Sequence, residues 1–100
     1  TTVNRALRIT PVVECVTRSG GGDFTVRFGY ENPNPVAITI PVGLGNFFAP
    51  LPIDRGQPTT FLPGRQQNVV TATGRYGILV WTLDGRAAVG LINSLNQCPQ

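Results

Sequence analysis

The sequence predicts an all-β protein, an antiparallel β-sandwich of about seven or eight short strands of the immunoglobulin-like or fibronectin-like kind. Residues 76–88, YGILVWTLDGRAA, form the longest apolar run of β type and contain both the single tryptophan and an Asp-Gly pair. Short segments of alternating apolar and polar residues recur between turn residues along the rest of the chain. With 12 glycines and 9 prolines among 100 residues, the chain is interrupted too often for long helices.

The run at residues 76–88 predicts a central hairpin. Alternate residues of its first half point to opposite faces of a strand, and both sets are largely apolar, so this strand should be covered on one face and shielded on the other. Asp84-Gly85 tolerates the positive φ angles of a type I′ turn, and residues 86–91 then form the return strand. Trp81 is expected in the core rather than on a ligand-binding platform.

The N-terminal residues predict a separate strand. Across residues 2–9, Val3, Arg5, Leu7 and Ile9 alternate with the other set of side chains, as in a strand with one buried face. Pro11 should interrupt this strand, because proline has no N–H for a sheet ladder. We therefore expect residues 1–10 to form an N-terminal strand, a candidate donor strand, and residues 11–100 to form a single sandwich domain whose next strand is residues 12–17.

The middle of the chain predicts four further strands and a rigid loop. Residues 23–30 place Phe24, Val26, Phe28 and Tyr30 on one face, and residues 36–42 place Val36, Ile38, Ile40 and Val42 inward. Between them, residues 31–35 (ENPNP) favour a turn because of their prolines and asparagines. Short strands are expected at residues 59–62 and 67–73. The predicted core comprises Phe24, Val26, Phe28, Ile38, Ile40, Val80, Trp81 and Leu83.

Residues 43–58 are expected to form a long irregular loop with a partner-contact role. Its adjacent Phe47 and Phe48 cannot both face one core from a strand, so one of them would be available to a partner. The candidate contact residues are Phe47, Phe48 and Leu51.

Cys15 and Cys98 stand near opposite ends of the chain without a CxxC spacing. A disulfide between them is favoured over two free buried thiols, and it would stabilise the fold by about 4–5 kcal/mol in the chain-entropy model. Such a bond indicates an oxidising compartment, so we expect a secreted protein, extracellular or on a cell surface.

The composition argues against catalysis, cofactors and metals. The absence of histidine removes Ser-His-Asp, Cys-His and nearly all zinc sites. Asp54 is expected to pair with Arg55, and Glu31 with Asn32 and Asn34 is typical of a capped turn more than of a calcium ligand set. A carboxylate pair assembled by the fold is the one hydrolytic arrangement that the sequence leaves open. The full set of carboxylates is Glu14, Asp23, Glu31, Asp54 and Asp84.

Charge and hydropathy argue against nucleic acid and membrane partners. The net charge is +3, and the eight arginines are dispersed without the basic cluster of a nucleic-acid-binding surface. No apolar run approaches the roughly 20 residues that cross a bilayer. Thr1 in place of methionine is typical of a processed chain or an excised segment.

The segments CVTRSGGGDFTVRFGYENPNPVAITIPVG, DRGQPTTFLPGR and LVWTLDGRAA, with the closing Cys98, resemble a module of secreted bacterial proteins with the pattern C…FGY-NPN…F.PGR…W-LDG-TA…C. The resemblance covers residues 12–98, and the FGYENPN and VWTLDGR blocks are its most specific parts. It implies an extracellular β-sandwich domain with no catalytic site to carry over. The cysteines depart from the immunoglobulin pattern, since they fasten the chain ends instead of flanking the tryptophan.

Two functions are consistent with these features. The first is a structural subunit that assembles into a surface filament, in which Val3, Arg5, Leu7 and Ile9 add as a strand to the sheet edge of another copy; pairing within their own domain is the alternative. The second is a monomeric module that binds a surface polysaccharide or protein. Its candidate aromatic platform is Tyr30, Phe47, Phe48 and Tyr76, for which packing under loops is the plainer account.

Overall fold

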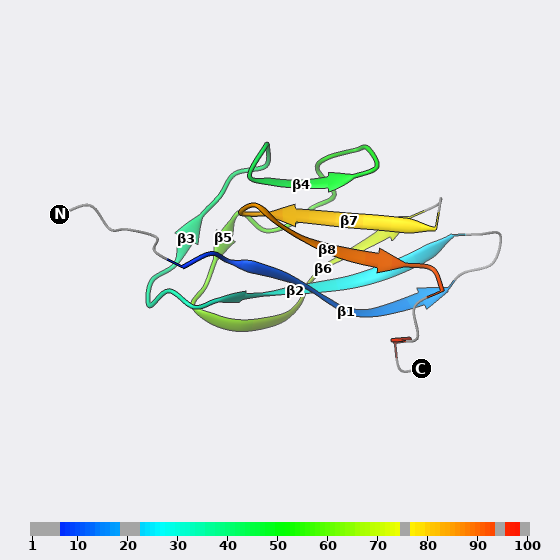
Figure 1. Ribbon diagram of the computed structural model, residues 1–100, viewed down its shortest axis with the longest axis horizontal. Coiled ribbons are helices and arrows are strands. Elements are labelled where there is room, and N and C mark those ends of the chain that lie inside the picture. The colour runs from blue at the N-terminus through cyan, green and yellow to red at the C-terminus, as the bar shows by residue number, and fades with distance from the viewer. Residues whose placement is uncertain (1–6, 19–22, 75–76, 94–95, 99–100) are drawn as a thin grey trace.

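The computed structural model describes residues 7–18, 23–74, 77–93 and 96–98. These residues form eight β-strands and no helix, which confirms the predicted all-β fold (Figure 1). The strands are β1 (Thr10–Arg18), β2 (Phe24–Asn32), β3 (Ile38–Thr39), β4 (Asn46–Ala49), β5 (Thr60–Phe61), β6 (Gly64–Gly74), β7 (Ile78–Leu83) and β8 (Arg86–Leu91).

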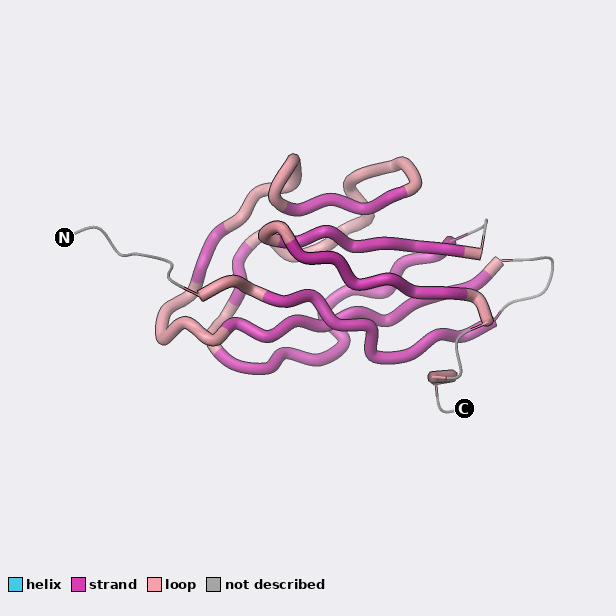
Figure 2. Tube along the Cα trace, viewed as in Figure 1, coloured by secondary structure: helices cyan, strands magenta, loops and turns pink. Residues whose placement is uncertain are grey.

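Two three-stranded antiparallel sheets form the layers of the sandwich. One has the strand order β1-β2-β6 and the other β4-β7-β8, while β3 and β5 pair as a small third sheet at one end (Figure 2). Every strand pair is antiparallel. The core lies between the two larger sheets, because each contributes one row of alternate apolar side chains to it.

The β7–β8 hairpin has the predicted geometry. Asp84 and Gly85 have φ angles of 54° and 80°, as a type I′ turn requires. β7 is the central strand of its sheet, between β4 and β8. Trp81 is fully buried; its ring stacks on Phe48 at a centroid distance of 5.7 Å and meets Phe28 edge-on at 5.8 Å.

The core contains most of the residues predicted for it. Ile38 is only partly buried against the core, since β3 lies at the end of the sandwich. Val80 is also partly exposed, because it alternates with Leu79 and Trp81 and therefore points away from the core. The buried members of the predicted set are Phe24, Val26, Phe28, Ile40, Trp81 and Leu83.

The predicted interruption at Pro11 is wrong. β1 begins at Thr10 and continues through Pro11, which pairs with Tyr30 of β2. Proline is tolerated here because β1 is an edge strand, so one side of its backbone needs no partner in the ladder. β1 instead carries its irregularity between Val13 and Cys15, where the register with β2 shifts.

The expected strand at residues 36–42 and the expected loop at residues 43–58 both need correction. Only Ile38–Thr39 is strand in the first segment, and Val36 is exposed. The second segment contains β4, which pairs with β7 through registers such as Phe48 with Trp81. The four-residue length of β4 leaves too little alternation in the sequence to indicate a strand.

Candidate functional site

Residues 7–9, which lead into β1, are hydrogen-bonded to other residues of their own subunit. Ile9 is fully buried in the core, and its N–H donates to Asp84 Oδ2 at 3.0 Å. The carbonyl of Leu7, whose side chain is half exposed, accepts a hydrogen bond from Asn34 Nδ2 at 2.9 Å. Residues 7–9 precede β1 and are not strand. Of the predicted assembly strand, Leu7 and Ile9 thus contact their own domain, and Val3 and Arg5 lie outside the described residues.

The asparagines of FGYENPN build the contact that holds Leu7. Asn32 Oδ1 accepts hydrogen bonds from the N–H and the Nδ2 of Asn34, both at 2.9 Å, which confirms the predicted capped turn. Asn32 Nδ2 donates to the carbonyls of Phe61 at 2.8 Å and Val36 at 3.2 Å. Both asparagines are buried, so the motif is a polar joint between the β2–β3 loop, β5 and the entering chain.

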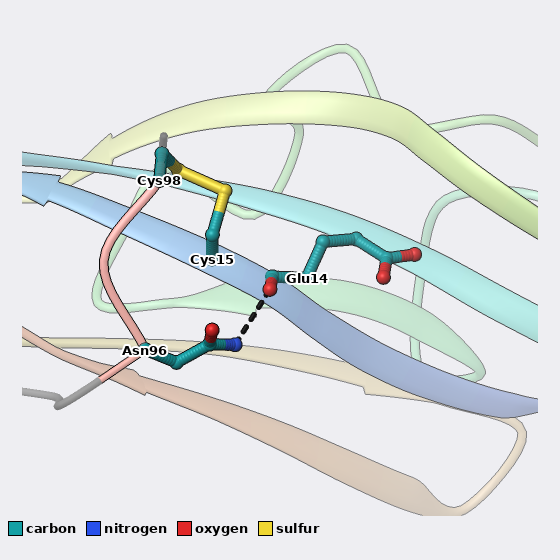
Figure 3. Close-up of a disulfide and its surroundings, with 4 residues drawn as sticks. All are labelled: Glu14, Cys15, Asn96 and Cys98. Carbon is teal, nitrogen blue, oxygen red and sulfur yellow. Dashed lines mark hydrogen bonds between the residues drawn. A yellow bond between two sulfur atoms is a disulfide. The ribbon is translucent and has the colours of Figure 1, made fainter. Parts of the chain in front are cut away.

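The outer edge of β1 is occupied by the C-terminal tail. Cys98 is bonded to Cys15, which confirms the predicted disulfide (Figure 3). The N–H of Val16 donates to the carbonyl of Asn96 at 2.8 Å, and the carbonyl of Val16 accepts from the N–H of Cys98 at 2.9 Å. Asn96 Nδ2 also donates to the Glu14 carbonyl at 2.6 Å (Figure 3). This part of β1 therefore cannot accept another strand.

The outer edge of β4 is closed by its own flanking loops. The N–H of Asn46 donates to the carbonyl of Gly43 at 3.1 Å, and the N–H of Phe48 donates to the carbonyl of Ile53 at 3.0 Å. On the other edge of this sheet, β8 lies beside β1 (Figure 1), and Arg86 Nη1 donates to Thr10 Oγ1 at 2.8 Å. The β4 edge of this sheet is thus closed by main-chain hydrogen bonds, whereas the β8 edge is covered by β1 without main-chain hydrogen bonds among the described residues.

The outer edge of β6 is different. The carbonyl of Thr73 points outward, because it accepts a hydrogen bond from Arg55 Nη1 at 2.8 Å. Backbone groups alternate between the two sides of an antiparallel strand, so Thr71 also directs its N–H and carbonyl outward. Among the described residues, no main-chain group bonds to that side of Thr71. β6 therefore presents unpaired backbone groups, as an edge strand that can accept another strand does.

Arg55 fixes the loop that ends this open edge. Its guanidinium donates to the carbonyls of Thr73 and Pro50, both at 2.8 Å, and lies 6.0 Å from the ring centroid of Phe48. The predicted pairing with Asp54 is replaced by these bonds, since Asp54 Oδ1 accepts from the N–H of Gly56 at 3.0 Å. The adjacency of Asp54 and Arg55 in the sequence does not reveal that the guanidinium joins β6 to the loop that follows β4.

The predicted partner-contact loop is divided between core and surface. Phe48 is fully buried on Trp81 and cannot contact a partner. Leu51 is 79% exposed, and the partly exposed Phe47 lines a surface pocket of about 340 Å³ with Gly43, Leu44 and Ile53. Of the other candidate platform residues, Tyr30 is buried and accepts a hydrogen bond from the N–H of Leu62 at 2.8 Å, while Tyr76 lies outside the described residues.

Among the charged groups of the described residues, Arg65 and Glu14 form an ion pair on the β1-β2-β6 sheet. Arg65 Nη2 donates to Glu14 Oε1 at 2.6 Å, and this hydrogen bond to the carboxylate raises the pKa of Arg65. Within residues 7–18, 23–74, 77–93 and 96–98, no three acidic, histidine or cysteine side chains gather where they could hold a metal ion. The same residues include no helix that is long and apolar enough to cross a membrane.

Comparisons of the chain with protein-family models, with curated proteins and with solved structures gave no match.

Proposed function

We propose that this protein is a non-catalytic structural subunit of an extracellular filament or fibre, and that its copies join by β-strand addition. The donor is the N-terminal segment of one copy, and the acceptor is the outer edge of β6 in the next. The resemblance of the sequence to extracellular sandwich modules supports this proposal. The Cys15–Cys98 disulfide is compatible with an extracellular location.

The unpaired edge of β6 is the observation that carries the proposal. Strand addition takes its affinity from main-chain hydrogen bonds, so it needs an edge with free N–H and carbonyl groups. The tail closes the described edge of β1 at Val16, and loops close β4. β6, with 11 residues, is the longest of the described strands, and among the described residues its outward groups at Thr71 have no main-chain partner.

The position of the chain ends supports a head-to-tail arrangement. Leu7 is bonded to Asn34 in the loop between β2 and β3, whereas Cys98 is bonded to Cys15 and Val16 in the second half of β1. Since residues 7–9 are held by their own domain, the donor segment must precede Leu7, and in the given sequence it includes residues 1–6, TTVNRA. Six extended residues span about 20 Å, which is enough to pair along half of β6.

A proline substitution tests the acceptor edge. In Thr71→Pro the lost N–H is the outward one, so the β2–β6 ladder keeps its hydrogen bonds while the incoming strand loses a donor group. Thr71→Ala is the matched control, because it removes the same side chain and keeps the N–H. Electron microscopy should show filaments from the wild type and from Thr71→Ala, and dispersed particles from Thr71→Pro. Filaments from a correctly folded Thr71→Pro protein would reject β6 as the acceptor.

The alternative is a monomeric module that binds a surface polysaccharide or protein. The pocket beside Phe47 favours it, since a concave apolar surface is typical of ligand sites. Retention on polysaccharide columns that is lost in Phe47→Ala, together with a monomeric wild type at all concentrations, would support this function instead.

A further inference from the structure

The edge of β1 around Val16 is filled by a short peptide, residues 96–98 of the same chain. This peptide, Asn-Gln-Cys, forms a parallel bridge to β1, with Gln97 opposite Val16. We call these three residues the tail segment. The bridge shows which kind of ligand this edge accepts, namely a peptide that runs parallel to β1 and bonds to it through its main chain.

Both main-chain and side-chain contacts hold the tail segment on β1. The N–H of Val16 donates to the Asn96 carbonyl at 2.8 Å, and the Val16 carbonyl accepts from the N–H of Cys98 at 2.9 Å. The Glu14 carbonyl accepts from Asn96 Nδ2 at 2.6 Å. The sulfur of Cys98 is bonded to that of Cys15 (Figure 3). The main-chain bonds fit any parallel strand, whereas the other two contacts need an asparagine followed two residues later by a cysteine.

This pattern occurs once in the sequence, at residues 96–98. The other cysteine, Cys15, follows Val13 and Glu14 and so lacks the asparagine. We call the residues of β1 that bind the tail segment, Glu14, Cys15 and Val16, the tail site. Every copy of the chain therefore carries one tail site and one ligand that fits it.

We infer that the tail site binds the tail segment of a second copy once the Cys15–Cys98 bond of its own subunit has been opened. A dithiol supplies the electrons and protons that convert this disulfide into two thiols, and the dithiol is itself oxidised to a disulfide. The tail segment then has no covalent link to its site, so it exchanges with the same segment of another copy, which offers identical groups. Reoxidation by oxidised glutathione closes a Cys15–Cys98 bond between the two copies and releases glutathione thiols.

The protein concentration decides between pairing within one copy and pairing between two. A segment tethered to its own site competes at an effective concentration on the order of 1 mM, so exchange is extensive near that concentration or when the tethered segment cannot form the bond. In the oxidised protein the covalent bond keeps a second segment out of the tail site. The inference concerns β1 and the tail segment, so it goes beyond the proposed addition of the N-terminal segment to β6.

Two single substitutions separate the tail site from its own ligand. Cys98→Ser keeps the tail site with the Cys15 thiol, and Cys15→Ser keeps the tail segment with the Cys98 thiol. A Cys15–Cys98 bond in a mixture of the two can therefore join only two different copies. The full-length variants are mixed in a glutathione redox buffer, and peptide mapping of the unreduced protein measures the mixed linkage and the two like-with-like linkages. Because this readout is covalent, it does not depend on whether filaments form.

We expect the Cys15–Cys98 linkage to exceed each like-with-like linkage by at least about tenfold, because hydrogen bonds to Val16 and Glu14 bring only this pair of sulfurs together. Random pairing of the thiols would make the mixed linkage about half of the total. A mixed linkage at that level would overturn the inference.

A further substitution in the Cys15→Ser variant tests whether the tail segment is recognised. Asn96→Ala removes the side-chain bond to the Glu14 carbonyl, so it should lower the excess of the mixed linkage. Asn93→Ala is the matched control, since Asn93 is exposed and no hydrogen bond joins it to β1 among the described residues. It should leave the excess unchanged. An equal excess for the two variants would contradict recognition of Asn96.

The wild-type protein gives a second test that needs no substitution. Reduced with a dithiol and reoxidised with glutathione at about 1 mM, it should yield dimers linked from Cys15 to Cys98 on a non-reducing denaturing gel. The same protein without the dithiol step should stay unlinked at that concentration. Reoxidation that returns only unlinked chains would overturn the inference.

Discussion

The indole N–H of Trp81 donates to Asn46 Oδ1 at 2.9 Å, and both residues are fully buried. The amide of the same asparagine donates from Nδ2 to the carbonyls of Ile40 at 3.0 Å and Pro58 at 2.9 Å. One side chain thus joins the central strand β7 to the segments that lead into β4 and β5. This buried joint positions the loops that close the β4 edge.

Replacing Asn46 with alanine should destabilise the protein by about 3 kcal/mol, because the indole N–H and two carbonyls would lose their partner in the interior. Asn96→Ala is the matched control: its side chain bonds the Glu14 carbonyl at an exposed position, and its loss should cost under about 1 kcal/mol. Urea unfolding followed by Trp81 fluorescence measures both. Equal unfolding midpoints for the two variants would contradict the role assigned to Asn46.

Reducing the Cys15–Cys98 disulfide should lower the free energy of unfolding by about 4–5 kcal/mol, since the bond closes a loop between residues 83 positions apart. The tail should also leave the β1 edge more readily, because its hydrogen bonds to Val16 and Glu14 are then no longer supported by the covalent link. Denaturant titrations with and without reductant give the stability difference. An unchanged midpoint in the reduced protein would show that the tail is held by other contacts.

The adjacent phenylalanines should respond in opposite ways. Phe48→Ala removes a fully buried ring that stacks on Trp81, and it should cost about 3–5 kcal/mol of stability. Phe47→Ala truncates a partly exposed ring on the outer face, so it should cost about 1 kcal/mol or less. The melting temperatures of the two variants, measured by thermal unfolding, check that Phe48 is the core residue and Phe47 the surface residue. A larger loss for Phe47→Ala would mean that the ring facing outward had been misassigned.

Gly90 is expected to tolerate no side chain. A Cβ there would lie 2.8 Å from Val26 Cγ2 and 2.9 Å from its Cγ1, across the core from β8 to β2. Gly90→Ala should therefore destabilise the protein by about 1–3 kcal/mol through overpacking. The neighbouring Val89→Ala, on the outward face, should change stability by about 0.5 kcal/mol or less. Matching unfolding curves for the two variants would argue against the close approach of the two sheets.

The sequence predicts those elements whose pattern is local. β2, β7 and β8 each have several alternating residues, and the Asp84-Gly85 turn has its own backbone preference, so their positions follow from the letters alone. β4 does not, because its four residues become a strand through pairing with β7. Pro11 misled the prediction of β1 because its effect depends on whether the strand is central or at an edge, which is a tertiary property.

The candidate site was predicted less completely for the same reason. The disulfide was predicted from the two cysteines, and the exposure of either Phe47 or Phe48 from their adjacency. The open edge at Thr71 depends on which strands lie beside β6, and the closed edge at Val16 on a tail that is distant in sequence. Nor does the pattern of β7 show that its second face stays uncovered, since a run that is apolar on both sides normally indicates burial on both.

Amide hydrogen exchange at Thr71 tests the strand-addition account most directly. In dispersed protein this outward N–H should exchange rapidly, whereas the N–H of Val70, which faces β2, should be protected. In assembled protein the account predicts that exchange at Thr71 slows by about a hundredfold or more, as for a bonded strand amide, while Val70 stays protected. Rapid exchange at Thr71 in intact filaments, or full protection already in the dispersed protein, would contradict it.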